Sequence, residues 1–389
     1  MGFLTEATLP VGSGVFNFNT PYEISWCSLD STHLLFCYNQ KNPNYFIGQV
    51  VELNGNSQPI LHTPTLIESV LYDKNSVISL SPTTVLLYVN KTFKILTINP
   101  DWSITPGNTS IEFDNNVLTP TAKYYHVISP TKVIFGYDYS FTISHNGFSG
   151  SGIGIKWISI NIDGSNNITF SPINDTPLLA EISNGTTTGY PVVGIGGMPD
   201  GSYFIISASD MQRPYVYNSG NGAWFGNIYN SSGSITATIA QTPTITLTQT
   251  KKVIALSTTK LIFVFDKSFV IYNITTSTWS ELVEFATYNN RIANFQDVIR
   301  LDDNHIMAIS NDSFTRIYVI RNNYDILGVV SPNTKFGLLI NDNSTIKDVS
   351  SFDNRLHIID NNNIAVIFRT HDQNNDTYNI AIKILYQPS

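Results

Sequence analysis

The chain has 389 residues, of which 13% are charged and 12% aromatic, and its formal net charge is −8. This acidic balance argues against the basic surface of a nucleic-acid-binding protein, so we expect no nucleic-acid partner. No apolar run reaches the roughly 18 residues that a membrane-spanning helix needs, so we expect no membrane insertion. Abundant Asn, Ser, Thr and aromatic residues favour strands and turns over helices.

The N-terminal residues carry neither the basic nor the apolar region of a signal peptide, so we expect synthesis in the cytoplasm. Cys27 and Cys37 lie on opposite arms of a predicted hairpin, where Cys27 faces roughly Leu34. Two unpaired thiols are therefore expected, which suits a reducing compartment. An extracellular location is the alternative, and ten Asn-x-Ser/Thr sequons would suit it. A chain this rich in Asn, Ser and Thr also produces sequons by chance, which is the interpretation we prefer.

A hairpin of two apolar strands around a short polar turn recurs seven times along the chain. The intervals between its copies run from 45 residues, Leu261 to Ile306, to 70 residues, Val133 to Tyr203. Recurrence at this period indicates a repeat architecture. The residues that open the second strand of the successive hairpins are Leu34, Val85, Val133, Tyr203, Leu261, Ile306 and Ile364.

The second strand of each hairpin is apolar at consecutive positions, as in 261–265, which predicts a strand that is covered on both faces. Most repeats then supply a third and a fourth strand, such as 93–99 and 102–107. Four short antiparallel strands with both faces covered are typical of a β-propeller blade. An open β-solenoid is the alternative, but its coils are shorter.

The sequence therefore predicts an all-β fold, in which residues 1–389 form one seven-bladed β-propeller of four-stranded antiparallel blades. The last repeat is one strand short, and residues 13–19 precede the first hairpin. We expect this segment to close the ring as the outer strand of the last blade, which would leave few open edges. The expected blades cover residues 20–70, 71–118, 119–188, 189–248, 249–290, 291–346 and 347–389.

Two segments, 217–224 and 272–279, share Tyr-Asn followed by five residues and Trp. This pattern resembles the third-to-fourth-strand signature of kelch propellers, and the resemblance implies that Tyr and Trp pack between blades. The rest of the kelch pattern is missing, since the one Gly-Gly pair, 196–197, precedes its turn. WD dipeptides and the Asp-box of sialidases are absent too. The chain thus resembles β-propellers in general, and we interpret Tyr217 and Trp224 as core residues and not as a ligand platform.

Few residues suggest catalysis or metal binding. Asp372, Asn374 and Asp376 alternate like the start of a calcium loop but lack its Gly and distal Glu, so a hairpin turn is favoured. The stretch 302–305 is also interpreted as a turn.

The glycine-rich stretch 146–154 lacks a phosphate-binding or nucleophile motif and is expected to be a flexible loop. The seven histidines show no metal-ligand spacing, and the seven arginines all follow residue 212, which leaves an anion site among the later blades open. We expect no catalytic residues, no cofactor and no metal.

The longest interval between hairpins carries two insertions, residues 139–152 and 171–189. Long loops on a rigid scaffold often carry binding functions, and neutral drift in a tolerant loop is the equal alternative.

Three classes of function remain: a structural or attachment protein of a virus particle, a carbohydrate-binding lectin, and a glycan hydrolase. The chain is similar in style to propellers of phage virions, being low in charge and rich in Asn, Thr, Ser and Tyr, with degenerate repeats. That resemblance implies a non-enzymatic component of a tailed-phage virion, with other virion proteins or a host-surface glycan as partners. The missing signal peptide argues against a secreted lectin, and the missing catalytic motifs argue against a hydrolase.

Overall fold

The structure, a computed structural model, describes most of the chain. Every regular element in this part is a β-strand. The described residues contain no helix with the length and apolarity that crossing a membrane requires. They are residues 10–20, 24–40, 43–53, 59–72, 75–89, 92–107, 111–112, 117–145, 148–172, 180–183, 186–189, 192–207, 225–239, 252–265, 268–284, 295–302, 305–311, 315–321, 337–339, 355–359, 363–372 and 377–386.

The described strands form seven sheets, which we number in chain order. The first sheet contains β2 (Ser25–Ser28), β3 (His33–Gln40), β4 (Tyr45–Glu52), β5 (Ile60–Leu61) and β6 (Thr65–Glu68). The second contains β7 (Asn75–Ser81), β8 (Thr84–Val89), β9 (Thr92–Ile98), β10 (Ile104–Pro106) and β11 (Ile111–Glu112). The third contains β12 (Val117–Ser129), β13 (Lys132–His145), β14 (Phe148–Ile162), β15 (Ile168–Pro172), β16 (Ala180–Ser183) and β17 (Thr186–Gly189).

In the fourth, fifth and sixth sheets the strands run outward in chain order, whereas the seventh takes its outer strand from the start of the chain. The fourth contains β18 (Val192–Gly197), β19 (Tyr203–Ser207), β20 (Phe225–Tyr229) and β21 (Ile235–Ile239). The fifth contains β22 (Lys252–Ser257), β23 (Lys260–Val264), β24 (Ser268–Asn273), β25 (Thr278–Trp279) and β26 (Val283–Glu284). The sixth contains β27 (Phe295–Asp302), β28 (His305–Asn311), β29 (Thr315–Arg321) and β30 (Gly337–Leu339). The seventh contains β31 (Arg355–Ile358), β32 (Asn363–Asp372), β33 (Thr377–Tyr386) and, beside β33, β1 (Pro10–Thr20).

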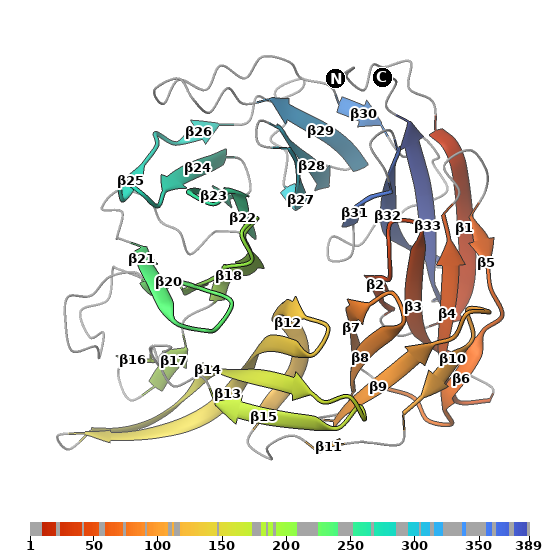
Figure 1. Cartoon of the computed structure of the whole chain (residues 1–389), viewed down its shortest axis with the longest axis horizontal. Helices are drawn as coiled ribbons and strands as arrows, with labels where there is room; N and C mark the ends of the chain where they lie inside the picture. Colours follow the sequence, from red (N-terminus) through yellow and green to blue (C-terminus); the bar gives the residue numbers. More distant parts are fainter. Residues whose placement is uncertain are drawn as a thin grey trace.

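Figure 1 shows the sheets arranged around a common centre, with the first hairpin strand of each sheet innermost. These inner strands contact one another in chain order, from β2 and β7 through β12, β18 and β22 to β27 and β31. The seventh sheet also contacts the first, through β1 and β3 and through the Nε2–H of His357, which donates to the carbonyl oxygen of Ser31 at 3.1 Å. The fold is all-β and propeller-like, with several four-stranded antiparallel sheets.

The seven predicted hairpins are confirmed, as β2–β3, β7–β8, β12–β13, β18–β19, β22–β23, β27–β28 and β31–β32. Each predicted opening residue is the first or second residue of its strand. The predicted coverage of both faces is confirmed as well. Every side chain is 0% exposed over 34–37 of β3, 85–89 of β8 and 261–264 of β23.

The turns of three hairpins make the same hydrogen bonds, which explains why these hairpins look alike. In the second sheet the Thr83 amide donates to Oγ of Ser81 at 3.3 Å, and the Thr83 carbonyl accepts from the Ile98 amide at the end of the third strand. The third and fifth sheets repeat both bonds with the residues Ser129, Thr131 and Ile162, and Ser257, Thr259 and Ile274. Each of these turns therefore stabilises its own hairpin through the Ser side chain and also holds the end of the third strand through the Thr carbonyl.

Between the sheets, apolar side chains form the core. One cluster joins the first and second sheets and includes Leu35, Val50, Leu87 and Leu96. Another joins the fourth and fifth sheets and contains Tyr272, whose ring centroid lies 4.7 Å from that of Trp279. The Tyr and Trp of the 272–279 segment thus pack in the core, whereas the matching segment 217–224 lies outside the described residues.

The cysteines lie on neighbouring strands without forming a disulfide. Cys27 is paired in register with Leu35, one position from the expected Leu34, because Ser28 pairs with Leu34. Both thiols are buried. Burial raises the pKa of Cys37 well above its ordinary value, and the neighbouring Cys27 raises it further.

Candidate functional site

The third sheet reaches beyond its neighbours as a two-stranded hairpin, formed by the far halves of β13 and β14. Figure 1 shows these yellow strands extending past the rest of the sheet. Their pairing is regular from Lys132↔Asn161 to His145↔Phe148. The expected insertion 139–152 is therefore a strand hairpin over its described residues. We call residues 139–154 the projection.

The expectation of a flexible loop at 146–154 is wrong from Phe148 onward. Those residues belong to β14 and pair in register with β13, which satisfies the backbone groups that face that strand. The register sets large apolar residues opposite glycines along the projection, in the pairs Tyr139↔Gly154, Phe141↔Gly152 and Ile143↔Gly150. Glycine in a strand often marks a place where another backbone approaches closely.

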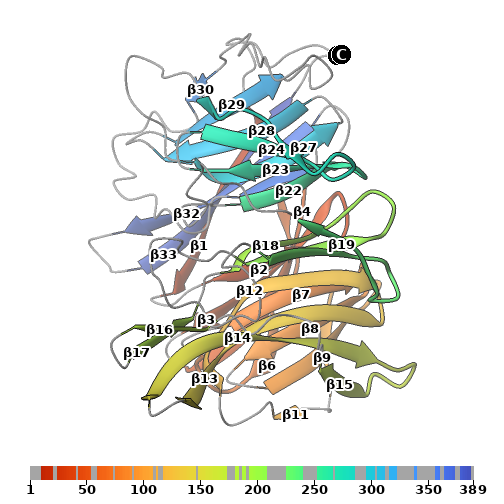
Figure 2. The same ribbon diagram turned by 90° about the vertical axis from the view of Figure 1, so that its left-hand side faces the viewer.

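The second insertion supplies that backbone. Within 171–189, β16 and β17 form a short antiparallel hairpin, and β17 pairs in parallel with β14 at Ser151↔Thr186 and Gly152↔Thr187. The two insertions thus share one sheet. Figure 2, seen from the side, places β16 and β17 at the left edge of the molecule.

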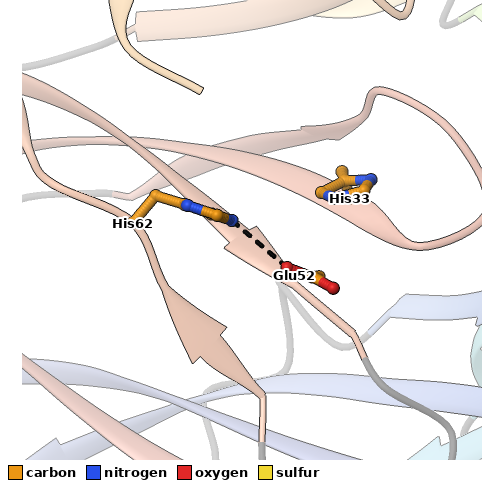
Figure 3. Close-up of side chains that lie close together, drawn as sticks. All are labelled: His33, Glu52 and His62. Carbon is orange, nitrogen blue, oxygen red and sulfur yellow. Dashed lines mark ion pairs between the residues drawn. The ribbon is translucent and has the colours of Figure 1, made fainter. Parts of the chain in front are cut away.

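A second group of interest lies in the first sheet, where His33, Glu52 and His62 bring their ligand atoms within 4.8 Å of one another (Figure 3). His33 opens β3 and pairs in register with Glu52, the last residue of β4. His62 follows β5, and its amide donates to the Val50 carbonyl at 3.0 Å, two residues before Glu52. Since residues two apart in a strand share a face, the sheet presents all three side chains on one side.

Asp30 orients the His33 ring. The Nδ1–H of His33 donates to both carboxylate oxygens of Asp30, each at 3.0 Å. The backbone amides of Thr32 and His33 donate to the same carboxylate. Burial opposes the ionisation of Asp30, but these hydrogen bonds outweigh it and hold its pKa below the ordinary value. With Nδ1 protonated, the lone pair of His33 is on Nε2.

His62 is fixed through its backbone. Its carbonyl accepts a hydrogen bond from Nε2 of Gln49 at 2.7 Å, and Oε1 of Gln49 accepts from the Tyr38 hydroxyl at 3.1 Å. Nε2 of His62 lies 3.5 Å from Oε2 of Glu52. This nitrogen is shielded from solvent and has no hydrogen-bond partner among the described residues.

Trp102, from the turn between β9 and β10 of the second sheet, covers the group. Its ring stacks on His33 with centroids 3.7 Å apart and lies 5.7 Å from the His62 ring. Trp102 has a φ of 64°, a left-handed conformation that is rare for a bulky side chain and costs on the order of 1 kcal/mol. Such strain is often found where a side chain is held in place for a function.

We call His33, Glu52 and His62 the histidine group. The sequence alone does not reveal it, because its members lie 19 and 10 residues apart and these spacings match no known metal motif. The signal exists only after the strand register is known, because pairing places His33 opposite Glu52. Two imidazoles and a carboxylate are a donor set for a borderline divalent metal. The group lies where β3 begins and β4 ends, whereas the projection lies where β13 ends and β14 begins. The two features therefore occupy opposite ends of their strands.

The other residues that the sequence singled out do not belong to the histidine group. Tyr139 and Phe148 belong to the projection, and Asp302 and His305 end and open neighbouring strands. Asn374 and Asp376 of the calcium candidate lie outside the described residues, as do two of the seven arginines. The other five arginines lie on strands of the sixth and seventh sheets, at Arg300, Arg316, Arg321, Arg355 and Arg369.

The sequence matches no protein-family model and no curated protein. Among solved structures, the chain is similar to a protein of unknown function from Dyadobacter fermentans, with a TM-score of 0.51 and 12% identity over 98% of this chain and 99% of that one. It is also similar to Sqt1 of Chaetomium thermophilum, with a TM-score of 0.50 and 8% identity over 97% and 98%. The WD40 domain of Toxoplasma gondii coronin matches 98% of this chain and 88% of its own at 10% identity and a TM-score of 0.42. At such identities the likeness concerns the fold alone.

Proposed function

We propose that this chain is a seven-bladed β-propeller that binds a partner without catalysing a reaction, and that the projection together with β16 and β17 forms the contact surface. The observation that carries this proposal is the pairing of β14 with β17. Ordering a residue costs roughly 1–2 kcal/mol of conformational entropy, so an ordered insertion needs interactions that offset this cost. Two insertions that pair with each other supply part of those interactions and extend one sheet edge outward.

In this proposal the seven sheets are the seven blades, and β1 completes the last of them. β1 pairs antiparallel with β33, in a register that includes Ser13↔Lys383 and Val15↔Ala381. A strand from the start of the chain in the last sheet leaves no free edge on β33 and joins the two ends of the ring.

The class of function that we favour is a structural component of a virus particle, in particular of a tailed phage, that acts in assembly or in host-surface attachment. Its support is the low charge and the Asn-, Ser-, Thr- and Tyr-rich composition. The partner would be a neighbouring virion protein or a host-surface glycan. A carbohydrate-binding lectin is the second candidate, and a glycan hydrolase is the third.

The test replaces residues 139–152 by a short Gly-Ser turn in the protein of the native source. We expect the shortened protein to keep its melting temperature but to be lost from particles purified on a density gradient, or to abolish their adsorption to host cells. Shortening the β18–β19 turn is the control, because it alters a turn outside the projection. Normal incorporation and adsorption of the shortened protein would refute the proposed contact surface.

The alternatives are tested on the purified full chain. Saturable binding to defined glycans on an array, in the absence of particle association, would support the lectin. Turnover of a glycan substrate would refute the non-enzymatic function.

A further inference from the structure

We propose that His33, Glu52 and His62 bind a divalent transition-metal ion, and that zinc is the ion that fits them best. This site is independent of the proposed contact surface. Zinc sites with two imidazoles, one carboxylate and one open position are a recurring arrangement. Hard ions such as calcium and magnesium prefer sites made of oxygen ligands, so a site with two ring nitrogens selects against them.

The distances suit a small ion. Zinc lies about 2.0–2.1 Å from histidine nitrogen and carboxylate oxygen, which places two tetrahedral ligands about 3.4 Å apart. The His62–Glu52 separation is already 3.5 Å. All three ligand atoms lie within 4.8 Å of one another, so side-chain rotations that shorten the widest separation by at most about 1.4 Å (4.8 − 3.4) bring them to zinc-ligand spacing.

The residues around the three ligands resemble the surroundings of known metal sites, because they fix the orientation of a histidine ring. A histidine ligand usually donates its second ring nitrogen to a carboxylate or a carbonyl, which fixes the tautomer. Asp30 accepts from Nδ1 of His33 in this way. His62 presents a shielded Nε2 with no hydrogen-bond partner among the described residues, and an ion would supply that missing interaction.

The position of the group permits an ion to enter. The side chains of His33, His62 and Glu52 are 13%, 20% and 35% exposed, so each is partly open to solvent, and a small turn of the His62 ring would bring its shielded Nε2 within reach of an ion. Trp102 covers one side of His33 and limits how the ring can turn. Three protein ligands leave a fourth position for water or for a donor group of a binding partner.

The test is a calorimetric titration of the chelator-treated full chain with zinc chloride. We expect one saturable site and a rise in melting temperature with added zinc. Glu52→Gln and His62→Gln keep the size of the side chain and should each weaken zinc binding by tenfold or more. Asp30→Asn should weaken it by about tenfold, because loss of an orienting partner typically costs 10–100-fold in affinity.

Two matched variants control for other sites. Glu281→Gln changes an exposed carboxylate of the fifth sheet, and His126→Gln changes a histidine between the third and fourth sheets; both should bind zinc as the unaltered chain does. Cobalt chloride gives a second measurement, since its visible spectrum reports nitrogen and oxygen ligation. The proposal is wrong if the unaltered chain shows no saturable zinc binding, or if Glu52→Gln and His62→Gln bind zinc with unchanged affinity. Melting curves recorded without metal show whether each variant is folded.

Discussion

Gly136 and Trp157 lie opposite each other in the pairing of β13 with β14, and a Cβ atom on Gly136 would lie 2.6 Å from Cζ3 of the indole. Trp157 is buried, so its ring has little room to move away. Gly136→Ala should therefore lower the free energy of unfolding by about 1–3 kcal/mol, as overpacking does in other cores. Chemical denaturation measures this change. Gly164→Ala, where a Cβ meets nothing within 4 Å, is the control and should change stability little.

The side-chain amide of Asn39 forms two hydrogen bonds with the backbone of Tyr72, as the backbone of a neighbouring strand would. Its amide donates to the Tyr72 carbonyl at 2.6 Å and accepts from the Tyr72 amide at 2.9 Å, and Asn39 is 0% exposed. Asn39→Asp removes the donor and buries a charge, so we expect a loss of about 2–3 kcal/mol at pH 7. The adjacent exposed Gln40→Glu makes a similar change of charge and should be nearly neutral. Equal stabilities of the two variants in urea would contradict this account.

Removal of β1 should destabilise the seventh sheet. Deleting residues 1–20 exposes the edge of β33, so we expect a melting temperature lower by several degrees or concentration-dependent aggregation. A variant that begins at Pro10 retains the paired residues and is the control. Differential scanning calorimetry and light scattering measure the two effects, and identical curves for both truncations would count against the role of β1.

Burial lowers the pKa of His126 below its ordinary value. The unfolded chain then binds a proton that the folded chain does not, so this contribution to stability is complete above pH 6.5 and is lost as the pH falls below that value. His126 lies beside Tyr203, with ring centroids 5.9 Å apart. In His126→Gln the fall in melting temperature between pH 7.5 and pH 5 should be smaller than in the unaltered chain. Parallel curves for the two proteins would show that His126 does not contribute.

The hairpins were predictable because their information is local. Burial on both faces leaves consecutive apolar residues, as in 261–265, and short polar turns mark where the chain reverses, with a Ser-x-Thr sequence in three of the seven. The projection was not predictable in the same way. Its alternating Gly and Ser residues have low strand propensity, and the strand forms because β13 and β17 provide backbone partners on both sides.

The histidine group needed information that no short stretch of sequence contains. His33 and Glu52 come from two neighbouring strands, His62 follows a third, and Trp102 comes from another sheet. Only the register of β3 on β4 and the contact between the first two sheets place them together.

The pairing of β1 with β33 sets an order on folding. Pro10 pairs with Leu385, 375 positions later (385 − 10), whereas strands of the other six sheets are drawn from nearby stretches of chain. Local hairpins close short loops and form quickly. The pairing of β1 with β33 closes the longest loop, so it has the largest entropic cost, and it can form only when both strands are present. During synthesis on the ribosome, six sheets can therefore assemble one after another as they emerge. The seventh is complete only after β33 has emerged, and until then β1 is a strand without its partner.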